Sequence, residues 1–298
     1  MYLFGCSMCY GVNADGVKNN VEYLQRRLMN KLTGFIDINL IDILKCCEKN
    51  EVYNPKLKNL YSVLATCDVI AQKANAIINM NEIPLFIGGD HSSVIGTVSA
   101  SSNYYDNLGL IWIDAHPDIN TDKTTVSGNI HGMTVAALLG MGEKKLTSIL
   151  NEHVKLKPEN IVMLGLRDID PPEKIILDKL NIEYFTYDEM KIKGIKHCLD
   201  EAKQYLGKKN IHVSIDIDSM NPDILPGVSV PVKGGFDVFE MNYILSYIKN
   251  RLKVIAWDIV EFNHNYDIND KTADYILELI RLISVNEKKI ETSVDIIL

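Results

Sequence analysis

Short apolar runs alternate with longer amphipathic stretches along almost the whole chain. The apolar runs contain few polar positions, which is typical of strands that are buried on both faces of a parallel sheet. The stretches between them have the apolar spacing of helices that cover such a sheet. The pattern predicts an α/β fold of three layers, α-β-α, with a mostly parallel central sheet.

The predicted strands are Tyr2–Gly5, Phe35–Ile38, Pro84–Ile87, Leu110–Ile113, Ile161–Leu164, Glu183–Thr186, Ile211–Ile215 and Val254–Ile259. The predicted helices are Val17–Leu32, Leu57–Met80, Ser92–Ser101, Met133–Gly140, Glu173–Leu180, Ile195–Tyr205, Val238–Asn250 and Thr272–Ile283. Asn13 or Asp15 is expected to cap the first of these helices, because both side chains accept hydrogen bonds from free backbone N–H groups.

Composition favours one domain spanning residues 1–298. The chain is 47% hydrophobic, enough for one large core, and no Pro/Gly/Ser-rich linker or internal repeat divides it. A net charge of -8, with dispersed Lys and Arg, argues against a nucleic-acid partner. No apolar run approaches the ~20 residues that cross a bilayer, and the N-terminus lacks a secretory signal. We therefore expect a cytoplasmic protein without a membrane partner.

The six cysteines suit a reducing compartment. Cys6 and Cys9 form a CxxC pair at the start of the chain, but no second pair completes a zinc site. Buried free thiols are therefore the favoured interpretation, with a redox or metal role as the minor alternative. Cys46, Cys47, Cys67 and Cys198 are interpreted as structural.

Three polar clusters each follow a different apolar run. They are Gly88-Gly89-Asp90-His91-Ser92, Asp114-Ala115-His116-Pro117-Asp118 and Asp216-Ile217-Asp218. In open α/β sheets, ligands bind beyond the carboxyl ends of the strands. We therefore expect these three remote segments to converge on one edge of the sheet.

The clusters offer the donors of a two-metal site. Asp114, His116 and Asp118 alternate, so in an extended chain they point to one side, and Asp216 and Asp218 repeat this spacing. With His91 they suffice for two cations if Asp114 and Asp216 bridge them. A single aspartate after a strand often only caps a helix or holds a turn. The joint set favours metal, because carboxylates this close repel unless a cation neutralises them. Without thiolates among the donors, manganese fits best, with cobalt, nickel or iron as substitutes.

The motifs GGDHS, DAHPDIN, SGNIHGM and SIDIDSMNPDILPGVSVP resemble, in this order, those of the ureohydrolases. Ser127-Gly128-Asn129-Ile130-His131-Gly132 resembles the arginases in particular, and the resemblance extends from about Gly11 to Thr272. It implies a three-layer α/β fold, a binuclear manganese centre with two Mn²⁺ per chain, and hydrolysis of L-arginine to ornithine and urea. It also implies a homo-oligomer, either a trimer or a hexamer.

The resemblance also implies a role for each site residue. One manganese is assigned to His91, Asp114, Asp118 and Asp216, and the other to Asp114, His116, Asp216 and Asp218. A hydroxide would bridge the two metals, and Asp218 would handle its proton. His131 matches the proton-shuttling histidine and Glu261 the glutamate that orients the guanidinium.

The substrate pocket needs neutral donors for an α-carboxylate and an acceptor for an α-ammonium group. Asn120, Ser127 and Asn129 can supply the donors, although an ordinary polar loop around Gly128 is the alternative. Asp170 matches the arginase residue that faces the α-amino group. A site built to pair a carboxylate rejects ligands that lack one, which favours arginine over agmatine.

Two positions depart from the arginase pattern: Ser229-Val230 replaces the usual Gly-Thr, and Pro117 replaces a common threonine. Val230 leaves open another ureohydrolase, of the agmatinase or guanidinobutyrase type. Pro117 is expected to point away from the metals. A catalytically silent metal-binding member is a further alternative, disfavoured by the complete ligand set with His131 and Glu261. His212 shares a strand face with Ser214 and Asp216 and could support the ligands.

Overall fold

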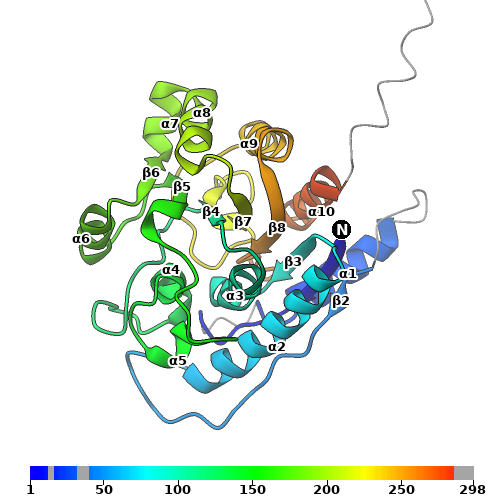
Figure 1. The fold of residues 1–298 in the computed structure, drawn as a ribbon. Helices are drawn as coiled ribbons and strands as arrows, with labels where there is room; N and C mark the ends of the chain where they lie inside the picture. Colours follow the sequence, from blue (N-terminus) through cyan, green and yellow to red (C-terminus); the bar gives the residue numbers. More distant parts are fainter. Residues whose placement is uncertain (13–16, 32–39, 285–298) are drawn as a thin grey trace, which may run out of the picture.

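An eight-stranded sheet forms the centre of the protein (Figure 1). The computed structural model describes residues 1–12, 17–31 and 40–284. Every pair of neighbouring strands in the sheet is parallel, and the strand order is β2-β1-β3-β8-β7-β4-β5-β6. The predicted fold class, an α-β-α arrangement around a parallel sheet, is confirmed.

The strands are β1 (Tyr2–Cys6), β2 (Asp42–Ile43), β3 (Pro84–Gly88), β4 (Leu108–Ile113), β5 (Ile161–Leu166), β6 (Glu183–Thr186), β7 (Asn210–Asp216) and β8 (Lys253–Val260). Seven of them overlap the predicted strands. Strand β2 was not predicted, because two residues are too few to produce a periodic signal. The predicted strand Phe35–Ile38 and the predicted caps Asn13 and Asp15 lie outside the described residues.

The α-helices are α1 (Asn20–Lys31), α2 (Leu60–Asn79), α3 (Val94–Tyr104), α4 (Thr134–Leu138), α5 (Lys144–Thr147), α6 (Pro171–Leu180), α7 (Tyr187–Lys193), α8 (Ile195–Leu206), α9 (Val238–Arg251) and α10 (Lys271–Ser284). Short 3-10 turns are η3 (His91–Ser93), η4 (Ile130–Met133), η5 (Pro158–Asn160) and η6 (Ile217–Ser219). The two short helices α5 and α7 were not predicted. No helix among the described residues is long and apolar enough to span a membrane.

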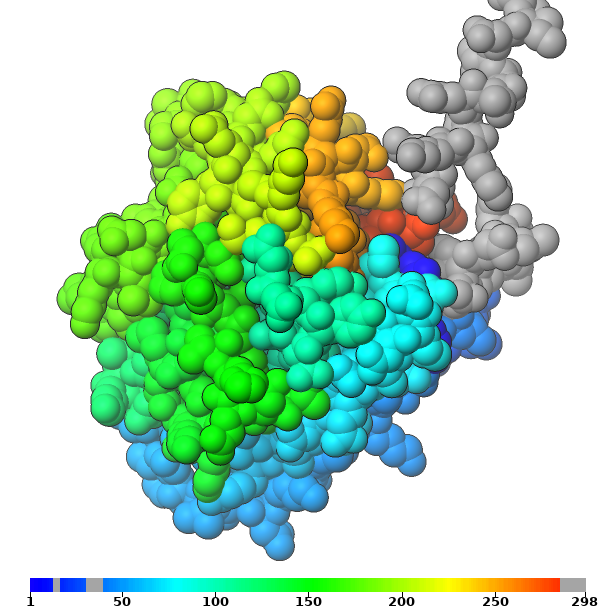
Figure 2. Space-filling view, in the orientation of Figure 1, coloured from blue at the N-terminus to red at the C-terminus, as the bar shows by residue number. Residues whose placement is uncertain are grey.

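Two hydrophobic cores lie on opposite faces of the sheet. One packs α1, α7, α8, α9 and α10 against residues such as Leu85, Ile113 and Ile215. The other packs α2 to α6 against alternate strand residues, including Phe86 and Trp112. In Figure 1 the two groups of helices lie on either side of the strands. The space-filling view shows the green, cyan and orange parts of the chain adjoining on one continuous surface (Figure 2).

Local capping explains where two helices begin. At α6, Asp170 and Glu173 form a capping box and Pro171 occupies the first turn, so the helix starts two residues before the predicted Glu173. Asp237 and Glu240 form the same arrangement at α9. The start of α6 matters for the site, because Asp170 and Glu173 both line the cavity described below.

Candidate active site

Four neighbouring strands, β3, β8, β7 and β4, bring acidic and imidazole side chains to one edge of the sheet. Asp114 follows β4 directly, Asp216 is the last residue of β7, and Glu261 follows β8 directly. His91 begins the 3-10 turn that follows β3. Parallel strands end at the same edge, so these residues meet although they are far apart in sequence.

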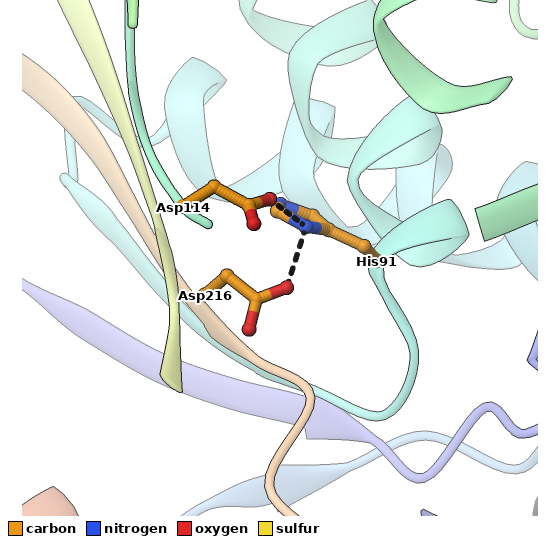
Figure 3. Close-up of side chains that lie close together, drawn as sticks. All are labelled: His91, Asp114 and Asp216. Carbon is orange, nitrogen blue, oxygen red and sulfur yellow. Dashed lines mark ion pairs between the residues drawn. The ribbon is translucent and has the colours of Figure 1, made fainter. Parts of the chain in front are cut away.

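The His91 imidazole lies among three carboxylates. Its Nδ1 is 3.1 Å from Asp114 Oδ2, 3.3 Å from Asp118 Oδ2 and 3.0 Å from Asp216 Oδ2. Figure 3 shows Asp114 and Asp216 directed at the same side of the ring. Both His91 Nδ1 and Asp114 Oδ2 are buried without a hydrogen-bond partner. Burying polar atoms without a hydrogen bond is costly, so two such atoms 3.1 Å apart fit the coordination of a shared cation.

A second group adjoins the first and shares Asp114. His116 Nδ1 lies 3.5 Å from Asp114 Oδ1 and 3.1 Å from Asp218 Oδ2. His91, Asp114 and Asp216 could hold one ion, and Asp114, His116 and Asp218 another. The donors are nitrogen and oxygen without sulfur, the set that suits manganese.

The expectation that the aspartates of each cluster follow one another on extended backbone was wrong. β4 ends at Ile113, before Asp114, and Asp118 has a left-handed backbone with φ 49°. At Asp216 the chain enters the turn η6, where Asp216 Oδ1 accepts a hydrogen bond of 2.7 Å from the Asp218 backbone N–H. Turns rather than a strand therefore bring each pair of aspartates together.

Neighbouring aromatic and polar groups fix both imidazoles. The His91 ring stacks on Trp112 at 3.8 Å between centroids, and its Nε2 lies 2.9 Å from Ser214 Oγ. Trp112 Nε1 donates to the His116 backbone carbonyl at 3.2 Å. The hydrogen bond at Nε2 leaves His91 Nδ1 as the nitrogen facing the carboxylates. The sequence gives no sign of this support, because Trp112 lies in an apolar run typical of a buried strand.

The protein groups alone set unusual protonation equilibria in the cluster. Burial raises the pKa of Asp216 and Asp218, the latter to about 6. Burial also acts on Asp114, but His116 and His91 outweigh it and hold its pKa below the usual range. Burial lowers the pKa of His91, yet three surrounding carboxylates raise it well above its ordinary value. A cation among these groups would relieve the repulsion between the carboxylates.

Glu261 links His91 to His131. Its Oε1 accepts a hydrogen bond of 2.8 Å from the His91 backbone N–H and lies 3.0 Å from His131 Nδ1. Its Oε2 is buried without a partner, and its backbone has φ 64°. A left-handed glutamate costs roughly 1–3 kcal/mol, which the surrounding bonds must offset. One oxygen of Glu261 is thus fixed, while the other is buried without a protein partner.

The Glu261–His131 pair predicts a pH-dependent stability. Burial lowers the pKa of His131, but the Glu261 carboxylate outweighs it and the pKa rises to about 9. Because the folded-state pKa exceeds the ordinary 6.5, the stabilisation is complete below about pH 6.5 and is lost as the pH rises through 9. In chelator-treated protein, His131→Asn should lower the free energy of unfolding by about 2–3 kcal/mol more at pH 6 than at pH 10. Urea unfolding measures this, and a pH-independent difference would contradict the pairing.

A cavity of about 390 Å³ opens above the cluster. It is lined by His116, Asp118, Asn120, Thr125, Val126, Ser127, Asn129, His131, Gly132, Asp168, Asp170, Glu173, Asp216, Asp218 and Val230. Glu261 lies behind this wall, joined to it through His131. The many carboxylates favour a cationic ligand.

The four predicted substrate-binding residues all line this cavity. The side-chain amides of the two asparagines, however, already donate hydrogen bonds within the protein. Asn120 Nδ2 donates to Asp170 Oδ2 at 3.1 Å, so Asn120 positions Asp170. Asn129 Nδ2 donates to the Val12 carbonyl at 3.2 Å, which leaves its second hydrogen for a ligand. Ser127 is exposed, and its Oγ accepts the Asn129 backbone N–H. Pro117 is buried and is not among the lining residues.

Sequence reasoning missed Arg167, which follows β5. Its guanidinium donates to the backbone carbonyls of Asp218 at 2.6 Å and Ser219 at 3.2 Å. These bonds fix the turn that carries Asp216 and Asp218. In the sequence, Arg167 is visible only as a basic residue at a strand end. Such residues are common on protein surfaces, so this position alone does not indicate a role in the site.

His212 supports the sheet behind the cluster instead of contacting it. Its Nε2 lies 2.6 Å from Asp258 Oδ2 on β8, and its Nδ1 lies 2.9 Å from Ser101 Oγ on α3. All three side chains are buried. His212→Ala should therefore destabilise the protein by about 3–5 kcal/mol, because it leaves Asp258 buried without this partner. A denaturant titration tests this, and a loss under about 1 kcal/mol would show that the network is not needed.

Comparisons with known proteins place this geometry in a family. The family model described as "Arginase family" matches residues 14–285. The arginase of Bacillus subtilis is 38% identical over 226 residues, which cover 76% of each chain. The crystal structure of the Bacillus cereus arginase superposes with a TM-score of 0.86 at 32% identity, covering 96% of this chain and 98% of the other. The Entamoeba histolytica arginase in complex with L-ornithine has a TM-score of 0.84 at 27% identity, with 95% and 99% covered.

Proposed function

Because this chain belongs to the arginase family, we propose that it hydrolyses the guanidinium group of L-arginine to ornithine and urea. The observation that carries the proposal is the pair of His/Asp groups that share Asp114 at the floor of an acidic cavity. Family membership makes the chain a hydrolase of amidine groups. The substrate is inferred from the cavity and from the arginases that resemble the chain.

We assign two Mn²⁺ to the cluster. His91, Asp114, Asp118 and Asp216 would hold one, and His116, Asp114, Asp216 and Asp218 the other. His91 Nδ1 and Asp114 Oδ2, which are buried close together without a hydrogen bond, support this assignment. When bound, the metal pair would lower the pKa of water from ~15.7 towards 7, so that hydroxide is available as a nucleophile near neutral pH.

The chain's own residues would orient the substrate and move its protons. Glu261 would orient the guanidinium, because its buried Oε2 has no hydrogen-bond partner within the protein. His131 Nδ1 faces Glu261, so Nε2 is the atom left to protonate the departing δ-nitrogen of ornithine. Asp218 would take the proton of the attacking hydroxide. Attack on the guanidinium carbon and release of the amine then yield ornithine and urea.

The α-amino acid end of the substrate would lie at the cavity mouth. Asp170, held by Asn120, would accept the α-ammonium group. Ser127 and Asn129, on the opposite loop, would donate to the α-carboxylate. Agmatine lacks this carboxylate, so it would leave their donors unsatisfied.

A urea-release assay with manganese-loaded protein tests the proposal. Arginine and agmatine are compared side by side, and kcat/KM is expected to be at least about 10²-fold higher for arginine. A preference for agmatine would instead indicate the agmatinase type. Protein that holds two metals but releases urea from neither compound would be a silent metal-binding member.

Val230 is the position where the cavity departs from the arginase pattern. The side chain is 39% exposed and lines the cavity, while Ser229 Oγ accepts a hydrogen bond of 2.9 Å from Asn263 Nδ2. Val230→Thr adds a hydroxyl at nearly constant volume, so KM for arginine should fall about 3- to 10-fold, the value of one hydrogen bond. Steady-state kinetics measure this, with Val126→Thr on the exposed rim as the matched control. Equal effects of both changes would show that position 230 does not select substrate.

We retain two wider proposals. The first is a homo-oligomer, a trimer or hexamer as in the family resemblance, which sedimentation velocity would test. The second is a reducing, cytoplasmic compartment, which fits six cysteines that form no disulfide with one another.

A further inference from the structure

Two cysteine side chains meet at the β2–β1 edge of the sheet, outside the residues that line the cavity. Cys6 ends β1 and is fully buried, and Cys46 lies in the half-buried segment after β2. Their Sγ atoms are 3.4 Å apart. A disulfide bond is about 2.05 Å long, so the sulfurs need to approach by only about 1.4 Å. We infer that Cys6 and Cys46 form a reversible disulfide when the protein meets a peroxide.

The backbone on either side of Cys46 keeps the two sulfurs together. The Leu44 N–H donates to the Gly5 carbonyl at 2.7 Å, extending the pairing between β1 and β2. The Cys47 N–H donates to Thr66 Oγ1 on α2 at 3.0 Å. The segment is thus anchored both to the strand that carries Cys6 and to the helix beside it. These backbone hydrogen bonds hold the Cys46 backbone beside the strand that carries Cys6.

Neither a metal nor another thiol explains the pair. Within the described part of the chain, the groups of three or more possible metal-ligand side chains contain no cysteine. Cys67 Sγ donates to the Ser92 carbonyl at 3.2 Å, and Cys198 belongs to the core on the other face of the sheet. From the sequence, Cys46 was assigned a structural role, whereas its Sγ lies beside that of Cys6.

Oxidation begins at the more accessible sulfur. Cys46 Sγ attacks a peroxide oxygen and the O–O bond breaks. Cys46 becomes a sulfenic acid, and one water is released. Cys6 Sγ then attacks Cys46 Sγ; the S–S bond forms, the S–O bond breaks and a second water leaves. Both thiol protons end in the two waters, and the peroxide is the two-electron oxidant. The hydrogen bond to Cys46 and burial raise the pKa of Cys6, so Cys6 acts second.

The Cys6–Cys46 disulfide would constrain the segment after Cys6, which contacts Asp90 and His131 near the site. Directly after Cys6, the Met8 carbonyl accepts the Asp90 N–H at 2.8 Å, and the Gly11 N–H donates to Asp90 Oδ2 at 2.9 Å. The Gly11 carbonyl also accepts the His131 N–H at 3.3 Å. Linking Cys6 to Cys46 closes a long loop of the unfolded chain, which stabilises the folded state. Oxidised protein should therefore resist heat better than reduced protein.

Peroxide treatment of the manganese-loaded full chain tests this inference. The protein is oxidised, alkylated under denaturing conditions, digested with trypsin and analysed by mass spectrometry with and without dithiothreitol. Because Cys6 and Cys9 share one tryptic peptide, and Cys46 and Cys47 share another, the variants Cys9→Ser and Cys47→Ser assign the link. Both variants should still form it, whereas Cys46→Ala should not. Cys46 is half-buried, so its truncation is expected to leave the fold intact.

The expected result is an intrachain link that removes two alkylatable thiols, is reversed by dithiothreitol, and raises Tm by several degrees in wild-type protein but not in Cys46→Ala. A link that disappears in Cys9→Ser or Cys47→Ser would overturn the inference, as would a link between two chains. Cys6 that stays fully alkylatable after peroxide treatment would also overturn it. A disulfide that forms but lowers Tm would contradict the claim that it stabilises the folded protein. None of these outcomes depends on which guanidino compound the protein hydrolyses.

Discussion

Asp216→Ala is expected to remove metal from one or both positions and to lower kcat for arginine by about 10³-fold or more, about 4 kcal/mol of transition-state stabilisation. Asp216 Oδ2 lies 3.0 Å from His91 Nδ1, and we assign this carboxylate to both cations. Without it, each of the two assigned cations would lose a carboxylate ligand. Metal analysis of the purified protein together with a urea assay measures the effect.

Two further variants separate loss of metal from loss of fold. Asp216→Asn keeps an acceptor for the Asp218 N–H that Asp216 Oδ1 now binds at 2.7 Å, so its Tm in chelator should stay near that of the wild type. It should still lose metal, because a neutral amide is a poor ligand beside other carboxylates. Asp223→Ala, at an exposed aspartate seven residues further on, is the matched control and should change neither the Tm in chelator nor the metal content. Full urea production by Asp216→Ala would show that Asp216 is not a ligand.

Glu261→Gln is expected to lower kcat/KM for arginine by about 10²- to 10³-fold, or about 3–4 kcal/mol. The carboxylate loses its charge while its volume is kept, so the guanidinium loses an ionic partner. The His91 N–H, 2.8 Å from Oε1, can still donate to the amide oxygen. Steady-state kinetics with arginine measure the change, and Glu278→Gln on the exposed face of α10 is the matched control.

A second readout distinguishes substrate binding by Glu261 from a structural role. The Glu261 charge raises the pKa of His131 to about 9, so its removal should return that pKa towards or below 6.5. The alkaline limb of the pH–rate profile should then move to lower pH in Glu261→Gln. A variant with reduced stability but an unshifted profile and unchanged KM would contradict the assignment of Glu261 to the substrate.

Much of the sheet and of the His/Asp cluster could be predicted from sequence, because strands buried on both faces leave uninterrupted apolar runs. The runs before His91, Asp114 and Asp216 are β3, β4 and β7, and the rule that parallel strands end at one edge brings these residues together. Arginase membership follows from the same motifs.

The rest depends on contacts that have no local signal. Asp118 reaches His91 only because its backbone is left-handed, and Arg167 acts through carbonyl groups that its sequence neighbours do not reveal. β2 is two residues long, and its pairing with β1 brings Cys46 to Cys6 across 40 positions of sequence. Long-range pairing of this kind is decided by tertiary packing and not by local propensity.

Anomalous X-ray scattering from crystals grown with manganese would show whether the remote strand ends assemble a two-metal centre. We expect two anomalous peaks per chain. One should lie among His91, Asp114, Asp118 and Asp216, and the other among Asp114, His116, Asp216 and Asp218. Crystals of protein with manganese-dependent activity that show no peak in this cluster, or a peak elsewhere in the chain, would contradict it.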